Sequence, residues 1–207
     1  MKLYYQNGFL VQHLYDVPNG MEKTIETCGY NGLCARNSNP LSKCTDQESR
    51  KLSHAAEWQK TPDKMFVSLE FISDPGILFQ YIQACRVRNI PIRLLFIESD
   101  YSEEVWTGPE MPKNFLGYEY NTIPIDNQII TDISWYTPFS VFRKGLNSWG
   151  LFPTMDDALL FKSAYDRAMA QGEIGDGEME THIFCLFEVR IEDVLQVLQT
   201  GVKIEPS

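Results

Sequence analysis

Three cysteines and one histidine near the start of the chain have side chains that bind metals or catalyse nucleophilic reactions: Cys28, Cys34, Cys44 and His54. Zinc needs four thiolate or imidazole ligands in a tetrahedron, and two cysteines a few residues apart usually supply two of them. Here 5, 9 and 9 residues separate the four in turn, so no two cysteines are close enough in sequence to form such a pair of ligands. The spacing favours free cysteines over structural zinc and leaves open a thiol enzyme that uses Cys34 with His54.

Two further cysteines fall in segments that the sequence predicts to be buried. Cys85 lies on the apolar stripe of a predicted helix, and Cys185 lies in an apolar predicted strand. Buried free cysteines behave as small hydrophobic residues, so we expect both in the core. The total of five is odd, and the N-terminal residues resemble no signal peptide. The sequence therefore favours a cytoplasmic protein with no membrane association.

Glu178-Met179-Glu180 places two carboxylates around a single residue. It resembles the E-x-E motif of arginine-specific ADP-ribosyltransferases, and that resemblance implies Glu180 as the catalytic glutamate. The same family also requires a Ser-Thr-Ser-like segment, which this sequence lacks. The preceding glycine-rich segment, 172–178, is acidic and leads into a strand, so it does not suit a phosphate. An enzyme is therefore an alternative, not the leading hypothesis.

The acidic charge of the chain is concentrated in its second half. The whole chain has 28 Asp and Glu against 18 Lys and Arg, a net charge of −10. Residues 1–97 have 11 basic and 9 acidic side chains, a net of +2, whereas residues 98–207 have 7 and 19, a net of −12. Proteins that bind nucleic acids present a basic face to phosphates, so this distribution argues against a nucleic-acid partner. It favours a basic protein partner or a solubilising surface.

Two acidic segments, 98–110 and 171–180, carry much of this surplus, and the first also contains Tyr101 and Trp106. In protein interfaces aromatic rings act as buried anchors, while carboxylates steer and pair with basic groups. The predicted partner-binding residues are Asp100, Tyr101, Glu103, Glu104, Trp106, Glu173, Asp176 and Glu178. The alternative is that both rings fold back onto the core and leave the acidic groups as a solvated surface.

A strand–helix–strand unit precedes the first acidic segment and must position it. Asp74-Pro75 has the residue types of a helix N-terminus, with Asp as N-cap and Pro in the first turn. Apolar runs at 65–72 and 92–97 predict buried strands on either side of that helix. The total length, about 65–97, is that of a βαβ-like unit.

The remaining patterns predict further helices and strands. Thr45-Asp46-Gln47-Glu48 has the spacing of a capping box and predicts a short helix to about Gln59. Strands are predicted near 9–17, 115–121, 128–135 and 181–191, and a closing helix at 192–199. A long helix is predicted at about 154–170, capped by Thr154 with Asp157, with an apolar stripe of Met155, Ala158, Phe161, Tyr165 and Ala168. Helices and strands that do not alternate strictly indicate an α+β fold. We expect one compact α+β domain over 1–207, with a mixed sheet, the long helix packed on it and a loop-rich region at about 18–45.

Several short motifs between residues 115 and 190 resemble those of bacterial immunity proteins. They are Phe115-Leu116-Gly117-Tyr118-Glu119-Tyr120, Ile130-Thr131-Asp132, Leu146-Asn147-Ser148-Trp149-Gly150-Leu151-Phe152 and Asp157-Ala158. The resemblance implies a small acidic protein that neutralises a toxin domain, often a basic nuclease, and it assigns no contact residue. The role of the motifs themselves is structural: Gly117 and Gly150 suit turns or close approaches.

Together these observations predict a cytoplasmic, non-enzymatic binding or inhibitor protein without a cofactor. An immunity protein that covers a basic toxin domain with its acidic surface is the leading hypothesis. The alternatives are a small enzyme, either ADP-ribosyltransferase-like or thiol-dependent, and a zinc-stabilised interaction module.

Overall fold

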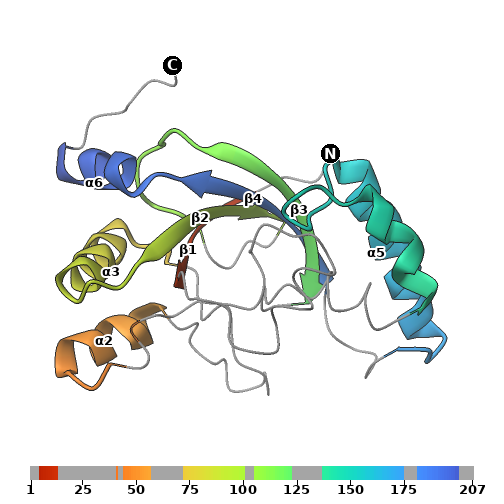
Figure 1. Cartoon of the computed structure of the whole chain (residues 1–207), viewed down its shortest axis with the longest axis horizontal. Coiled ribbons are helices and arrows are strands. Elements are labelled where there is room, and N and C mark those ends of the chain that lie inside the picture. Colours follow the sequence, from red (N-terminus) through yellow and green to blue (C-terminus); the bar gives the residue numbers. More distant parts are fainter. Residues whose placement is uncertain are drawn as a thin grey trace. The chain divides into compact units, whose positions relative to one another are not determined.

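The computed structural model describes residues 5–13, 41, 44–56, 72–100, 105–122, 137–174 and 181–200. Its elements, in chain order, are β1 (Tyr5–His13), α2 (Gln47–Ala56), α3 (Pro75–Val87), β2 (Ile92–Ser99), β3 (Asn114–Thr122), the 3-10 helix η2 (Thr137–Gly145), α5 (Met155–Ala170), β4 (Thr181–Val189) and α6 (Ile191–Thr200) (Figure 1). The four strands form an antiparallel sheet in the order β1-β2-β4-β3. The predicted α+β class is confirmed, but the sheet that these strands form is antiparallel and not mixed as expected.

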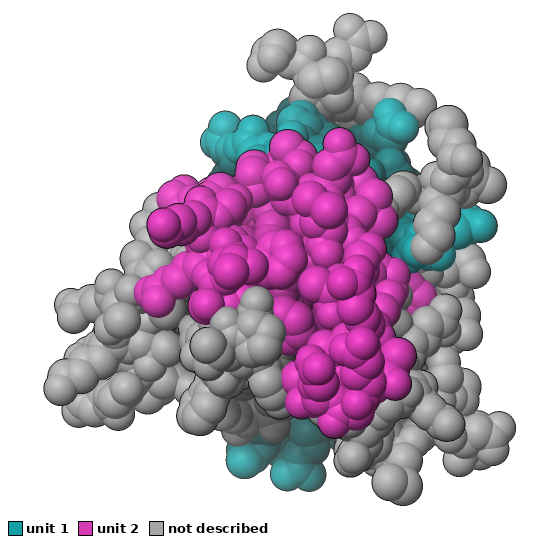
Figure 2. Space-filling model, turned by 90° about the vertical axis from the view of Figure 1, so that its right-hand side faces the viewer, with its two compact units in different colours: residues 1–16, 36–115, 186–207 teal, residues 17–35, 116–185 magenta. Residues whose placement is uncertain are grey.

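The chain divides into two compact units, which Figure 2 distinguishes by colour. Unit 1 comprises residues 1–16, 36–115 and 186–207, and unit 2 comprises residues 17–35 and 116–185. The hydrophobic cluster around Phe9 and Phe96 lies in unit 1, and the cluster around Phe161 lies in unit 2. Among the described residues, no helix is both long enough and apolar enough to cross a membrane.

In unit 1, local sequence signals set the start and the buried face of α3. The carboxylate of Asp74 accepts a hydrogen bond from the Ile77 backbone N–H at 2.8 Å, and Pro75 occupies the first turn, where its missing N–H costs nothing. The buried side chains recur at helical spacing and are Leu78, Tyr81, Ile82, Ala84 and Cys85. Both the cap and the apolar stripe with Cys85 confirm the prediction for this helix.

β1 forms backbone bonds on both of its edges at Phe9. On one edge Phe9 is the register partner of Phe96 in the antiparallel pairing with β2, and on the other edge its own N–H and carbonyl form hydrogen bonds with Ile72, at 3.0 and 2.8 Å. The register shifts between Gln6 and Gly8, and Gly8 has φ of +142°. A Cβ on Gly8 would lie 2.6 Å from the Ile72 carbonyl oxygen, so only glycine fits here.

The N-terminus of α2 differs by one residue from the predicted capping box. The Ser49 backbone N–H donates to the carboxylate of Asp46 at 2.9 Å, which makes Asp46 the capping residue in place of Thr45. The same carboxylate accepts a hydrogen bond from Arg88 at 2.7 Å. Arg88 is 42 residues away in sequence, so this ion pair adds a long-range link to a cap that Asp46 and Ser49 form locally.

In unit 2, the Asn147 side chain ties a turn to β3. Its amide group donates to the Leu116 carbonyl at 2.7 Å, and its carbonyl accepts from the backbone N–H groups of Trp149 and Leu151 at 2.9 and 3.2 Å. Tyr118 and Phe152 then pair through two backbone hydrogen bonds of 2.8 and 2.9 Å. The turn therefore docks onto the strand as an additional short β-bridge.

The glycines of the two motifs meet the conformational demands predicted for them. Gly117 has φ of +149°, and a Cβ there would lie 2.6 Å from the Cβ of Leu151. Gly150 has φ of +74° within the turn. Both are positions that an L-residue occupies only with strain. The structural role predicted for these motifs is confirmed.

α5 supplies much of the core of unit 2. Thr154 accepts a hydrogen bond from the Asp157 backbone N–H at 3.2 Å and caps the helix as predicted. The buried positions of the helix are Ala158, Phe161, Tyr165 and Ala168. The Phe161 ring lies 5.4 Å from that of Tyr120 on β3 and 5.3 Å from that of Phe139 on η2. Edge-to-face aromatic packing of this kind stabilises the unit beyond simple area burial.

Other expectations fall partly or wholly outside the described residues. Of the predicted strand 65–72 only Ile72 is described, and the predicted strand 128–135 and most of the loop-rich region are not. β1 begins four residues before the predicted start at residue 9, and the 3-10 helix η2 has no counterpart in the sequence prediction. β2, β3, β4, α5 and α6 lie within two residues of their predicted limits.

Replacing Asn147 with Ala is expected to lower the free energy of unfolding by about 1–3 kcal/mol, because it removes three hydrogen bonds and leaves buried backbone groups without partners. Ser148→Ala, at an exposed position of the same turn, is the control and should change stability by less than about 0.5 kcal/mol. Urea unfolding measures both. Equal stability of the two variants would contradict the docking role of Asn147.

The cap of α2 is expected to contribute to the pH dependence of stability. The Ser49 backbone N–H, together with Arg88, lowers the pKa of Asp46 from 3.8 to about 2. Because the folded pKa lies below the unfolded one, the stabilisation is complete above pH 4 or so and disappears as the pH falls towards 2. The stability difference between wild type and Asp46→Ala should shrink over that pH range, whereas Gln47→Ala should show no such change.

Candidate functional site

A pocket of about 320 Å³ lies in unit 1, beside the loop that connects β2 to β3. Its lining residues are Gln6, Phe96, Trp106, Pro109, Glu110, Met111, Pro112 and Lys113. The set combines aromatic and other apolar surfaces with a carboxylate, an amide and an ammonium group. This is the usual composition of a binding pocket, in which apolar walls supply burial and a few polar groups supply selectivity.

Backbone hydrogen bonds hold the loop 105–113 against the rest of unit 1. The Trp106 N–H donates to the Gln6 carbonyl at 2.6 Å, and the Thr107 N–H donates to the Ser73 carbonyl at 3.2 Å. Gln6 lies on β1 beside the bulge at Gly8, and Ser73 immediately precedes the cap of α3. The loop is thus fixed to two elements that are far from it in sequence.

The Trp106 ring is part of the core and forms a wall of the pocket. It is 6% exposed and lies edge-on to the rings of Phe9 and Phe96, with centroids 5.0 and 6.3 Å away. Its indole N–H donates to the Pro109 carbonyl at 3.1 Å. A Cβ on Gly108 would collide with the indole ring. The ring is therefore folded back onto the core, and a ligand meets it only as a wall of the pocket.

The ammonium group of Lys113, in the pocket wall, is stabilised by a carboxylate and two aromatic rings. The group forms an ion pair with Glu98 and lies 4.8 Å from the centroid of the Phe96 ring and 4.6 Å from that of Phe187. Aromatic faces attract cations through their quadrupole, and the carboxylate adds a charge-assisted hydrogen bond. Because Glu98 neutralises Lys113, the unbalanced charge of the pocket wall is that of Glu110.

Glu110 is exposed at the rim, and no ion pair joins it to another residue in the described part of the chain. Its carboxylate lies in the same wall as the prolines Pro109 and Pro112. The cavity can bury the apolar part of a ligand, and the exposed carboxylate beside it can then pair with a positive charge on the same ligand. The pocket therefore has the arrangement that a long cationic side chain requires.

The structure places three of the eight predicted partner-binding residues. Trp106 lines the pocket, Asp100 follows β2 and is half-buried, and Glu173 is exposed after α5 in unit 2. The other five, Tyr101, Glu103, Glu104, Asp176 and Glu178, lie outside the described residues. The contacts predicted for the two acidic segments therefore stay predictions.

Most of the pocket wall escaped the sequence prediction. Gly108, Pro109 and Pro112 do mark an irregular loop, and that signal could have drawn attention to Met111 and Lys113. Gln6 and Phe96 carry no such signal, because they belong to strands that are 90 residues apart in sequence. Their approach to Trp106 depends on the pairing of β1 with β2.

The metal and thiol hypotheses are not tested. Cys28, Cys34 and the proposed catalytic Glu180 lie outside the described residues, as does the side chain of His54, whose backbone belongs to α2. The described residues contain no group of three or more potential metal ligands. Within the same residues, Cys44 and Cys85 are free thiols.

Comparison of the chain with known protein families, with curated proteins and with solved structures finds no match. The resemblance to immunity proteins therefore has no independent support, and the function has to be argued from the residues of the pocket and from the charge of the chain.

Changing Gly108 to Ala is expected to destabilise unit 1 by about 1–3 kcal/mol, because the added methyl group collides with the indole of Trp106 and displaces the loop. Gly145→Ala is the matched control, since a Cβ at that position meets no atom within 4 Å. Thermal unfolding compares the two variants with the wild type. If Gly108→Ala were as stable as Gly145→Ala, the packing of Trp106 against this loop would be disproved.

Proposed function

We propose that the protein binds a basic protein partner, and that its pocket accepts a Lys or Arg side chain of that partner. The observation that carries the proposal is the combination of the aromatic pocket wall with the exposed carboxylate of Glu110 at the rim. The aliphatic stem of the guest would pack on Met111 and the prolines, and its charged end would reach Glu110. The aromatic faces favour a cation over a neutral guest.

The environment of Lys113 supports this chemistry. In the same pocket wall, an ammonium group is already stabilised by a carboxylate and two aromatic rings. Of these three groups only the Phe96 ring also lines the pocket, where the Glu110 carboxylate and the Trp106 ring supply the same kinds of group for a second cation. At about 320 Å³ the cavity is near the lower limit of small-molecule sites, which span roughly 300–1,000 Å³, and this size suits a single long side chain.

The charge distribution supports a basic protein over an isolated basic amino acid. Residues 98–207 have a net charge of −12, and segment 98–110, which contains Trp106 and Glu110, has five acidic and no basic side chains. Such a surface accelerates association with a basic partner by long-range attraction. Carboxylates around the pocket would pair with further basic groups at the edge of the interface.

Within this class we favour a toxin-neutralising immunity protein that covers a basic toxin domain. The motifs within residues 115–190 support this choice through their resemblance to immunity proteins, and the acidic surface agrees with a basic target. The proposal includes a cytoplasmic location, which the odd cysteine count and the free thiols favour. It requires no catalytic group, because occlusion of the partner's active cleft is sufficient for inhibition.

Two short peptides of equal length, one rich in Lys and Arg and the other rich in Glu, test the chemistry of the pocket. We expect only the basic peptide to bind, with an affinity that falls as salt screens the attraction. Neutralising Glu110 with Glu110→Gln should weaken binding about tenfold, equal to about 1.4 kcal/mol. Fluorescence anisotropy of labelled peptides at low and high salt measures both effects.

Glu192→Gln is the control, because it removes the same charge from an exposed position on α6, outside the pocket wall. If both variants lost the same affinity for the basic peptide, the loss would be due to net charge alone, and the proposed role of the pocket would be wrong. For the toxin assignment, the partner captured from the native host is expressed with and without this protein. Growth arrest that only the wild type relieves supports neutralisation, whereas a harmless partner contradicts it.

A further inference from the structure

Unit 1 contains two cysteines of unequal accessibility against one hydrophobic core. Cys85, on the buried face of α3, is 0% exposed, whereas Cys44 is half-buried just before α2 and packs against the same cluster. Both are free thiols. The binding site proposed above uses neither of them.

Two hydrogen bonds align the segment that contains Cys44 with α3. On one side of Cys44, the Leu41 N–H donates to the Tyr81 hydroxyl at 3.1 Å. On the other side, Arg88 donates to the Asp46 carboxylate at 2.7 Å. These bonds tie Leu41 and Asp46, on either side of Cys44, to α3 and its C-cap residue.

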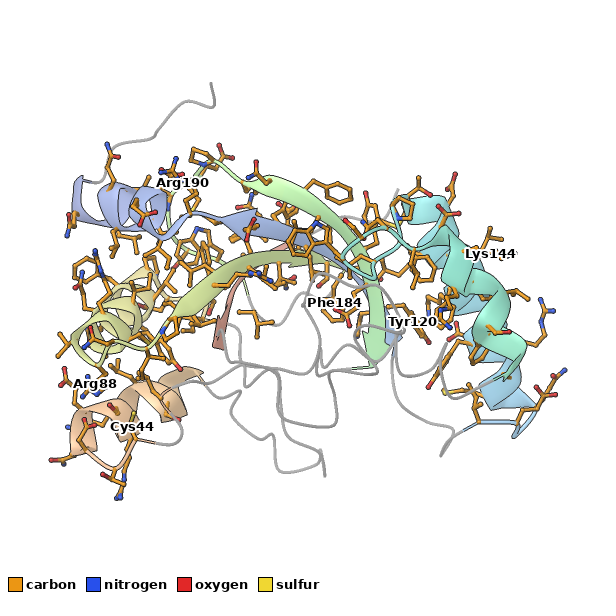
Figure 3. All side chains as sticks on the ribbon, in the orientation of Figure 1. Cys44, Arg88, Tyr120, Lys144, Phe184 and Arg190 are labelled. Carbon is orange, nitrogen blue, oxygen red and sulfur yellow. The ribbon has the colours of Figure 1, made fainter. Side chains whose placement is uncertain are left out.

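The positions on α3 place Cys85 between the two hydrogen bonds. Tyr81 precedes Cys85 by four residues and Arg88 follows it by three, so all three project from one side of the helix. Cys44 likewise lies between Leu41 and Asp46. Figure 3 shows Cys44 and Arg88 in the region where α2 and α3 are in contact. The two thiols therefore occupy corresponding positions on facing segments.

The electrostatics of Cys85 also depend on Cys44. Burial is the main cause that raises the pKa of Cys85 from 9.0 to about 12; the neighbouring thiol of Cys44 contributes in the same direction, and Arg88 opposes both. Cys85 is therefore a neutral, shielded thiol at physiological pH. The half-buried Cys44 is the one that a soluble reagent can reach first.

We propose that Cys44 and Cys85 are a redox modification site, at which a small disulfide such as oxidised glutathione converts the two thiols into an intramolecular disulfide. The reaction takes place in two exchange steps. First, the Cys44 thiolate attacks one sulfur of the small disulfide; its S–S bond breaks, a mixed disulfide forms on Cys44 and one small thiol leaves.

In the second step, Cys85 loses its proton and its thiolate attacks Sγ of Cys44, which expels the second small thiol. In total, two protein thiols are oxidised, and one small disulfide is reduced to two small thiols. Because the protonated form of Cys85 dominates, the second step is slower than the first and accelerates with rising pH. The product joins the segment 41–46 covalently to α3.

The experiment treats the reduced full-length protein with oxidised glutathione and follows its intact mass with time. We expect transient addition of one glutathionyl group, followed by a product about 2 Da lighter than the reduced protein. Peptide mapping without reductant should recover the Cys44 and Cys85 peptides as a single linked species, which dithiothreitol separates. The oxidised protein should unfold at a higher temperature than the reduced one, because the bond restricts the unfolded chain.

Cysteine variants separate this pair from other pairings. Cys85→Ala should stop at the mixed disulfide on Cys44, and Cys44→Ser should yield no linked species that contains Cys85. Cys185→Ala, which removes a buried thiol from unit 2, is the control and should form the Cys44–Cys85 link at the wild-type rate. Even if Cys85→Ala fails to fold, the wild-type peptide map decides: a persistent mixed disulfide, or a link from Cys44 to another cysteine, overturns the proposal.

Discussion

The packing of unit 1 around the pocket depends on the double pairing of β1 at its bulge. Gly8 adopts φ of +142° at a point where the Ile72 carbonyl leaves no room for a side chain. Because the bulge is there, Phe9 can bond to Ile72 on one edge while keeping its register with β2 on the other. The Gln6 carbonyl, on the opposite side of the bulge, accepts from the Trp106 N–H. Within a few residues, β1 therefore contacts β2, the residue Ile72 that precedes α3, and the loop that lines the pocket.

This arrangement fixes the position of the irregular loop that lines the pocket. Its backbone is tied to Gln6 and Ser73, and the Trp106 ring is packed on Phe9 and Phe96, so the loop has little freedom to lose on binding. The apolar pocket wall includes Trp106, which is packed in the core, together with Pro109 and Pro112 of the loop. Gly108 leaves room in the loop for the Trp106 ring. The pocket wall is therefore attached to the core, and it contains one exposed carboxylate, that of Glu110.

In each unit, one polar side chain attaches an irregular segment to a neighbouring element. In unit 1, a carboxylate at residue 46 caps α2 and receives the distant Arg88. In unit 2, one amide at Asn147 closes a turn and bonds it to β3 beside Gly117. In both, one polar side chain bonds to more than one group: Asp46 to the Ser49 N–H and Arg88, and Asn147 to backbone groups of Leu116, Trp149 and Leu151.

The sequence alone determined the features that depend on neighbouring residues. The caps Asp74 and Thr154, the apolar stripes of α3 and α5 and the glycines of the turn motifs follow from backbone sterics and local hydrogen bonds. Tertiary structure decided what depends on distant partners: Arg88 pairs with the Asp46 carboxylate that caps α2, and the Trp106 ring packs against Phe9 and Phe96 in the core. The pocket was likewise not predictable, because its walls come together only when β1 pairs with β2 and the loop bonds to both β1 and Ser73.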